Sequence, residues 1–269
     1  MFHKIVYFFL LLLFFFLYAC EKQVVLTPEN SEEKVVVEAM FTDIPFLTTV
    51  KLSKTKGINE NILNHPKITD AEVKIIDKTT QDTIVFTSNN DGTYSTNISA
   101  IVGHQYKLEI VYENQTYTSD KTVLSTVSLN QIKSHPKEGT DKYYLEMIFE
   151  DDPNTQDFYL FICTNTANPD DVRIIVRSDY LYNTDTQSIN IDEELFVGGE
   201  YWQVVMFHID RENYEYLKIM NRAKVSLVNG AHPFYGISLG NPVSTVEGEG
   251  VLGYFIASSV SVSPISIGN

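Results

Sequence analysis

The sequence contains very little cysteine. Only Cys20 and Cys163 occur in 269 residues, so a framework of several disulfides is excluded. The six histidines are scattered, and neither an H-E-x-x-H pattern nor a close cysteine pair offers zinc ligands. We therefore expect no disulfide framework and no transition-metal site.

Basic residues are also scarce. The chain has 20 Lys and Arg against 35 Asp and Glu, a formal net charge of −15. A chain with this charge repels nucleic acid and anionic lipid surfaces, so we expect no nucleic-acid partner.

A long apolar run occurs once, from Ile5 to Ala19. It follows Lys4, ends on small Ala19 beside Cys20, and is shorter than the roughly 20 residues of a membrane-spanning helix. These features predict a signal peptide over residues 1–19, and the alternative is a short transmembrane anchor. Leu17-Tyr18-Ala19-Cys20 also resembles the bacterial lipobox. We therefore expect Cys20 to be lipidated and residues 20–33 to form a polar tether.

The chain beyond residue 33 reads as β-structure almost throughout. Short runs rich in Val, Ile, Thr and Tyr alternate with turn residues, among them Asn90-Asp91-Gly92 and Glu113-Asn114. This pattern predicts an all-β protein, with an immunoglobulin-like β-sandwich over residues 34–127 and a second β-rich domain over residues 128–269. No internal repeat is visible, so a solenoid or propeller is not supported.

One amphipathic helix is expected in the second domain. Asp210 is a good N-cap, and Tyr214, Leu217 and Met220 follow at i, i+3 spacing on one side. We interpret this segment as a helix laid over a sheet. The alternative is a helix that binds a partner.

No catalytic set emerges from the residues. Gly236–Gly240 fits the G-x-S-x-G pattern around Ser238, but no His follows His232, so the hydrolase order cannot be completed. Cys163 lies in the apolar run "FYLFICTN", where a buried small hydrophobe is expected rather than a reactive thiol. We therefore expect a protein that is not an enzyme and needs no cofactor.

The densest acidic cluster, Glu150–Asp157, is the best calcium candidate, and the charged loop near Asp192 is less specific. Asp151, Asp152, Asn154 and Asp157 could supply loop oxygens, although the turn glycine and the closing Glu of an EF-hand are missing. The alternative is that Asp-Pro-Asn simply makes the turn between two strands.

Four aromatic residues lie in or beside the long excursions of the second domain. We expect Tyr180, Tyr182, Tyr201 and Trp202 to be exposed there and to bind a protein partner, as aromatic anchors of interfaces do. The alternative is that these aromatics complete the second core.

Several segments together resemble one family. They are "VKLSKT", "ITDAEVKIID", "NDGTYS", "GHQYKLEI", "NYEYLKIM" and "NPVSTVEGEGVLGYF". The chain resembles a group of Bacteroidota outer-membrane lipoproteins catalogued only as a domain of unknown function. The resemblance implies lipid anchorage in the outer membrane and an accessory binding role beside a TonB-dependent receptor in nutrient uptake. The alternative function is a structural or adhesive protein of the cell envelope.

Overall fold

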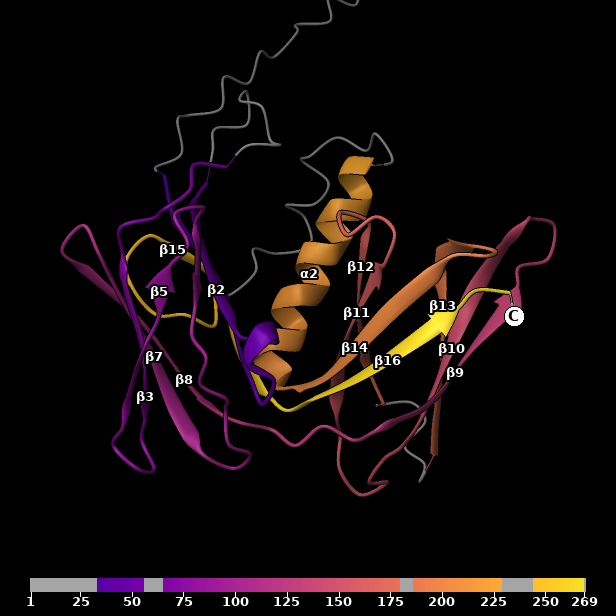
Figure 1. Ribbon diagram of the computed structural model, residues 1–269, viewed down its shortest axis with the longest axis horizontal. Coiled ribbons are helices and arrows are strands. Elements are labelled where there is room, and N and C mark those ends of the chain that lie inside the picture. The colour runs from indigo at the N-terminus through magenta and orange to yellow at the C-terminus, as the bar shows by residue number, and fades with distance from the viewer. Residues whose placement is uncertain (1–32, 56–64, 180–185, 229–243, 269) are drawn as a thin grey trace, which may run out of the picture. The chain divides into compact units, whose positions relative to one another are not determined.

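The computed structural model describes residues 33–55, 65–179, 186–228 and 244–268, with the backbone alone for residues 222–228. Residues 32–269 form one compact unit. The described residues of this unit form two β-sandwiches and one long helix (Figure 1). No helix among the described residues is long and apolar enough to cross a membrane. The predicted signal peptide, Cys20 and nearly all of the tether lie outside the described residues.

The first sandwich consists of two sheets. One has the order β15-β1-β2-β6-β5 and the other the order β4-β3-β7-β8. Alternate side chains of their strands point into a common core, as in "VVVEAMFT", where every second residue is buried. This agrees with the predicted sandwich. The strands are β1 (Val35–Thr42), β2 (Thr49–Lys54), β3 (Glu72–Asp77), β4 (Thr83–Val85), β5 (Thr87–Ser88), β6 (Thr93–Ser95), β7 (Gln105–Tyr112), β8 (Gln115–Thr122) and β15 (Val251–Ser258); a 3-10 turn, η1 (Pro45–Leu47), lies between β1 and β2.

Both predicted hairpin turns are present in this sandwich. Asn90 and Gly92 have φ of 62° and 86° between β5 and β6, and Glu113 and Asn114 have φ of 48° and 62° between β7 and β8. Asn and Gly tolerate this left-handed region, which lets the strands reverse in a tight turn.

Asp77 is the last residue of β3, and its carboxylate is buried. Its Oδ2 lies 2.8 Å from His104 Nδ1, and its Oδ1 accepts hydrogen bonds from the backbone N–H groups of Thr79 and Thr80. Burial alone would raise the pKa of Asp77, but these bonds outweigh burial and lower the pKa to about 2. The ionised carboxylate therefore stabilises this end of the sandwich.

The second sandwich packs a sheet of order β13-β10-β9 against a sheet of order β12-β11-β14-β16. Its core contains Phe149, Phe161, Phe196 and Trp202. The strands are β9 (Leu129–Pro136), β10 (Lys142–Glu150), β11 (Phe158–Asn165), β12 (Val172–Ser178), β13 (Thr186–Val197), β14 (Tyr201–Ile209) and β16 (Val260–Ser266).

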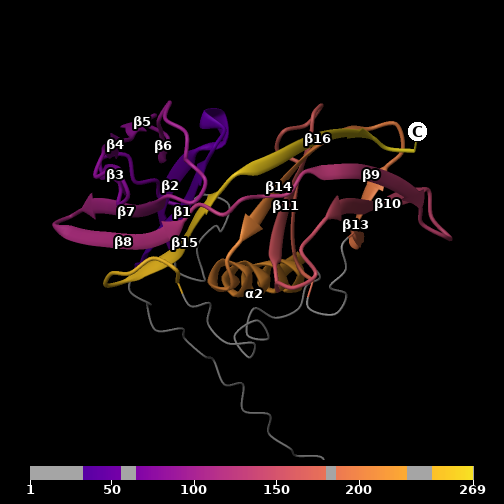
Figure 2. The same ribbon diagram turned by 90° about the horizontal axis from the view of Figure 1, so that it is seen from below.

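The helix α2 (Arg211–Val228) covers the outer face of the second of these sheets (Figure 2). Strand β11 is therefore buried on both faces. Tyr159, Phe161 and Cys163 face the sandwich core, whereas Phe158 and Leu160 face the helix. This explains why "FYLFICTN" is apolar throughout instead of alternating.

The set of side chains that the helix buries differs slightly from the predicted set. Asp210 is the N-cap, with Oδ1 accepting a hydrogen bond of 2.8 Å from the backbone N–H of Asn213. Tyr214 and Leu217 are buried as expected, together with Tyr216, but Met220 is 45% exposed. The expectation for Met220 was wrong, although the helix still reaches the sheet one residue later, where the Asn221 side chain donates to the Ile174 carbonyl of β12 at 2.9 Å.

The last two strands of the chain lie in different sandwiches. Strand β15 pairs in parallel with β1 of the first sandwich, and β16 pairs antiparallel with β14 of the second (Figure 1). The predicted division between residues 127 and 128 places β15 in the second domain, whereas the strand lies in the first sheet. The sequence pattern indicates that Val251–Ser258 is a strand, but it does not specify which distant strand will pair with it.

Candidate functional site

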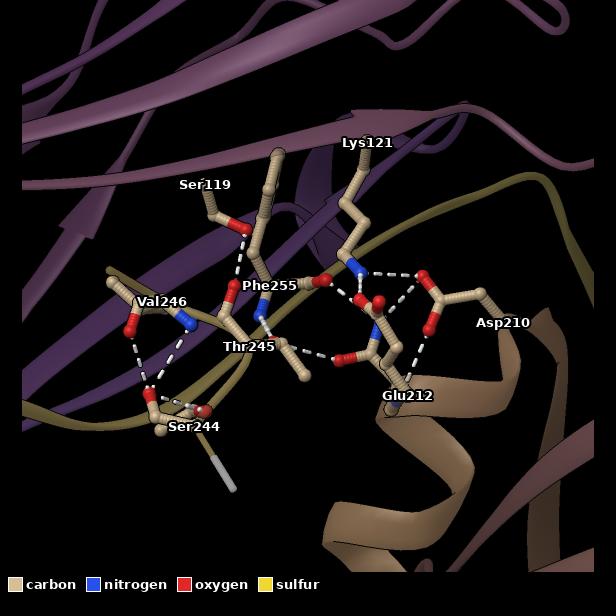
Figure 3. Close-up of polar contacts among 10 residues, drawn as sticks. Ser119, Lys121, Asp210, Glu212, Ser244, Thr245, Val246 and Phe255 are labelled. Atoms are coloured by element: carbon tan, nitrogen blue, oxygen red, sulfur yellow. Dashed lines mark hydrogen bonds and ion pairs between the residues drawn. The ribbon is translucent and has the colours of Figure 1, made fainter.

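A partly buried network of polar side chains joins the start of the helix to the first sandwich (Figure 3). Lys121 of β8 lies 2.8 Å from Asp210 Oδ2 and 2.9 Å from Glu212 Oε2. Burial would lower the pKa of Lys121, but the hydrogen bonds and charges of these two carboxylates outweigh burial and raise it. The two acidic side chains also lie at the helix N-terminus, where negative charge is favoured.

Asn213 is the centre of this network and is 1% exposed. Its amide donates to the carbonyl oxygen of Phe255 at 2.8 Å, and its Oδ1 accepts from the Thr245 hydroxyl at 3.0 Å. The Thr245 Oγ1 in turn accepts from the Phe255 backbone N–H at 3.1 Å, and the Ser119 hydroxyl donates to the Thr245 carbonyl at 2.6 Å (Figure 3). These hydrogen bonds thus connect the start of the helix to β8 and β15.

A groove with a volume of about 430 Å³ opens beside the network. This volume lies within the roughly 300–1,000 Å³ of small-molecule sites. Its walls come from the first turns of the helix and from the segment that leads into β15. The lining residues are Arg211, Glu212, Glu215, Tyr216, Ile219, Ser244, Thr245 and Glu247.

The serine and threonine hydroxyls of the groove form hydrogen bonds within the fold. Ser244 Oγ donates to the Val246 carbonyl at 2.8 Å and accepts from the Val246 N–H at 3.1 Å. Thr245 holds Asn213 and Phe255, as described above. These two hydroxyls are engaged within the fold, and the rest of the groove wall combines Arg211 and three glutamates with Tyr216 and Ile219.

Three carboxylates converge at one end of the second sandwich. Asp151 follows β10, Asp157 precedes β11 and Asp179 follows β12. One oxygen from each lies within 4.8 Å of the other two. At an effective dielectric constant of about 20, two ionised carboxylates at this separation repel by about 3 kcal/mol.

Hydrogen bonds hold these carboxylates in place. The Tyr159 hydroxyl donates to Asp151 Oδ1, and the backbone N–H of Asp157 donates to Asp179 Oδ1 at 3.0 Å. The other oxygen of each, Asp151 Oδ2 and Asp179 Oδ2, is buried without a hydrogen-bond partner among the described residues. Asp179 as a whole is 3% exposed. Buried oxygens without a partner are rare, so this arrangement requires an explanation.

The third carboxylate faces a histidine. Asp157 Oδ1 lies 3.0 Å from His208 Nε2, and His208 Nδ1 lies 3.0 Å from the carbonyl oxygen of Ser125. Both ring nitrogens face acceptors, so only the charged imidazolium can donate to both.

The crowding of these carboxylates affects their protonation. Burial, followed by the negative charge of Asp157, raises the pKa of Asp151. Burial, followed by the charges of Asp151 and Asp157, raises the pKa of Asp179. Among the described residues, His208 is the one basic side chain that pairs with the cluster, since no Lys or Arg there pairs with any of the three.

Only two of the four residues predicted as calcium ligands lie in this cluster of carboxylates. Asp151 and Asp157 come together, but Asp152 and Asn154 do not join them. Asp152 Oδ1 instead accepts from the Asn154 backbone N–H at 2.9 Å and from its side chain at 2.8 Å, which is the predicted turn chemistry. Asp179 was missed because it is 22 residues away from Asp157 and carries no local signal of its own.

The four aromatic residues predicted to bind a partner differ in where they lie in the structure, and their role in binding stays a prediction. Tyr180 and Tyr182 lie outside the described residues, and Tyr201 is 62% exposed. The expectation of exposure was wrong for Trp202, which is 1% exposed. Its ring packs edge-on against Phe196 at 4.9 Å, and its indole N–H donates to Glu200 at 2.9 Å, because alternation along β14 turns it into the core.

Cys163 is fully buried in the second core, as expected. Burial, followed by the charge of Glu194, raises the pKa of its thiol to about 12, so the thiolate is disfavoured. Ser238, the serine of the G-x-S-x-G pattern, lies outside the described residues.

Exposed apolar side chains gather on two neighbouring segments of the first sandwich. Phe46 in η1 is 76% exposed, and Ile98, Ile101 and Val102 are each about half exposed. A hydrogen bond of 2.8 Å from the Ala100 N–H to the Thr42 carbonyl joins the two segments. We call these four residues the apolar rim.

Comparison with known proteins places the chain in a family. No curated protein matches it. Among solved structures it is similar to the FN1–FN3 domains of chicken CNTN1, with 6% sequence identity and a TM-score of 0.24. That likeness covers 65% of this chain and 60% of the other, so this chain spans less than two thirds of it. Residues 21–263 match the family described as "Domain of unknown function (DUF4249)", and the chain belongs to that family.

Proposed function

We propose that this protein is a non-enzymatic lipoprotein of a Bacteroidota outer membrane that binds a TonB-dependent receptor and assists nutrient uptake. The observation that carries the proposal is the apolar rim, Phe46, Ile98, Ile101 and Val102. Exposed apolar side chains that are grouped on adjoining segments are typical of surfaces that bind another molecule.

A protein is a better occupant of the apolar rim than the bilayer surface. The chain carries 35 acidic against 20 basic residues, and a protein with this excess is repelled by anionic lipid headgroups. A protein partner can cover the apolar side chains and still offer polar groups to the acidic surface around them.

Lipidation of Cys20 supports the same proposal. The tether of residues 20–33 would hold the folded part within a few tens of ångströms of the membrane. Confinement near a receptor in the same membrane raises the effective concentration, so an interface of modest size can be occupied.

The proposal is tested by crosslinking in native membranes. A photo-crosslinking amino acid is placed at Phe46 in the apolar rim, at Tyr201 in the second sandwich and, as a matched control, at Val85, an exposed apolar residue of edge strand β4. We expect Phe46 to crosslink to a TonB-dependent receptor identified by mass spectrometry. We expect Val85 to give no such product.

Two results would overturn this assignment. Crosslinks that reach no receptor from either Phe46 or Tyr201 would favour the structural or adhesive alternative. Equal receptor crosslinking from Val85 would show proximity without a specific interface.

Cys20→Ala is expected to abolish acylation and release the protein from the membrane fraction, and unchanged acylation would contradict the lipid anchor.

A further inference from the structure

We propose that Asp151, Asp157 and Asp179 bind a calcium ion that links the two sheets of the second sandwich. Asp151 extends from β10 in one sheet, whereas Asp157 and Asp179 flank β11 and β12 in the other. One oxygen from each carboxylate lies within 4.8 Å of the other two. A cation shared by the three would therefore tie the ends of both sheets together.

The first argument is the unpartnered oxygens. Asp151 Oδ2 and Asp179 Oδ2 are buried without a hydrogen-bond partner among the described residues, while the other oxygen of each is held by a donor. The bonds from Tyr159 and from the Asp157 backbone fix the two carboxylates in position. The Gln187 side chain also interacts with Asp151, so Asp179, which is 3% exposed, is the clearer case of a fixed carboxylate with one oxygen left for a ligand.

The second argument is charge. Three ionised carboxylates carry −3, and His208, which pairs with Asp157, contributes +1 in its charged form. The cluster then holds −2, which a divalent cation neutralises. Buried charge without compensation is strongly disfavoured, so the cation would supply what the described side chains do not.

The third argument is the chemistry of the donors. All three side chains offer carboxylate oxygens, which suit hard cations, and His208 has both ring nitrogens turned to protein acceptors. Calcium binds oxygen at about 2.3–2.6 Å, so two ligands on opposite sides of it can stand roughly 4.8 Å apart. Magnesium usually keeps several waters and is bound through one or two carboxylates rather than by a fixed set of three, which favours calcium here. Water would complete the calcium shell.

Protonation is the rival explanation. If no cation binds, the repulsion can be relieved by a proton on one of the two buried carboxyl groups. The two explanations differ in one respect. A bound cation makes stability depend on calcium, whereas a proton does not.

The test uses the full-length protein, purified from membranes in detergent and stripped with EGTA. Calcium chloride is titrated to about 10 mM, above the roughly 10⁻⁴–10⁻³ M at which extracellular calcium modules bind. Binding is followed by calorimetry and by the thermal unfolding midpoint. We expect saturable binding of one ion and a rise in Tm of about 5 °C or more at a hundredfold excess over Kd.

Three variants locate the ion. Asp179→Asn and Asp151→Asn keep the shape of the side chain and remove one charge, and each is expected to weaken calcium binding at least tenfold. Without calcium these variants should be at least as stable as the wild type, because repulsion is relieved. The matched control is Asp152→Asn in the same acidic loop, whose carboxylate is engaged with Asn154 and which should bind calcium normally.

Each other outcome overturns the proposal. No binding and no calcium-dependent shift in Tm for the wild type would leave protonation as the explanation. Unchanged binding in Asp179→Asn, or an equal loss in Asp152→Asn, would place any ion elsewhere. Equal affinity for magnesium would refute the assignment to calcium.

Discussion

Replacing Gly253 with alanine should disrupt the strand that closes the first sandwich. Gly253 lies in β15 directly opposite Val37 of β1 and has φ of +137°. A Cβ at this position would overlap the carbonyl oxygen of Val37 and lie 2.7 Å from its backbone N and C atoms. Because the clash is with backbone, it cannot be relieved by a side-chain rotation.

Two effects set the magnitude. A non-glycine residue held in this region of φ costs about 1–3 kcal/mol. A shift of backbone in a packed strand pair adds about 1–3 kcal/mol. We therefore expect Gly253→Ala to lower the free energy of unfolding by about 2–6 kcal/mol, a large share of the roughly 5–15 kcal/mol of an ordinary domain.

The assay is urea unfolding followed by circular dichroism, with Gly139→Ala as the matched control. Gly139 also has positive φ, at +75°, but a Cβ there meets nothing within 4 Å. Its substitution carries only the conformational effect, about 1–2 kcal/mol. If the two variants lose the same stability within about 0.5 kcal/mol, the close approach of β15 and β1 is not what requires glycine at position 253.

Three further outcomes follow from buried groups. Asp77→Asn should lower the free energy of unfolding by about 1–2 kcal/mol above pH 4, because the ionised carboxylate stabilises the folded protein. The difference from the wild type should vanish as the pH falls through about 2, since the pKa of this carboxyl group is about 2 in the folded protein against an ordinary 3.8. A difference that grows as the pH falls would contradict this. Asn213→Ala should cost about 2–4 kcal/mol in urea unfolding, since it leaves the Phe255 carbonyl and the Thr245 hydroxyl without their partner. A loss below about 1 kcal/mol would mean that this network does not stabilise the fold. Cys163 should resist a thiol reagent until the protein unfolds, and rapid labelling of the native protein would contradict its burial.

The local features of the fold could be predicted from sequence because their causes are local. Asn90 and Gly92 adopt positive φ within the turn that they form, and Asp210 caps the helix that begins one residue later. Alternating apolar residues gave the strands of the first sandwich. In each case the physical cause lies within a few residues of its effect.

The features that were missed depend on distant partners. Trp202 and Tyr201 are neighbours in sequence, and only the pairing of β14 with β11 and β16 decides which of the two faces the core. Asp179 joins Asp151 through the packing of two sheets, and no nearby residue signals this. The parallel pairing of β15 with β1 spans more than two hundred residues.

One of the segments that carry the family resemblance, "NPVSTVEGEGVLGYF", has a structural role in the part that is described. Gly253 admits the backbone of β1, and a Cβ on Gly248, which has φ of +146°, would come within 2.5 Å of the Tyr117 ring. Thr245 holds Asn213 at the start of the helix. These residues are fixed by close packing between parts of the chain that are far apart in sequence, so a match to them identifies the architecture and not an activity. Our two binding proposals therefore rest on other parts of the chain, the apolar rim of the first sandwich and the acidic cluster of the second.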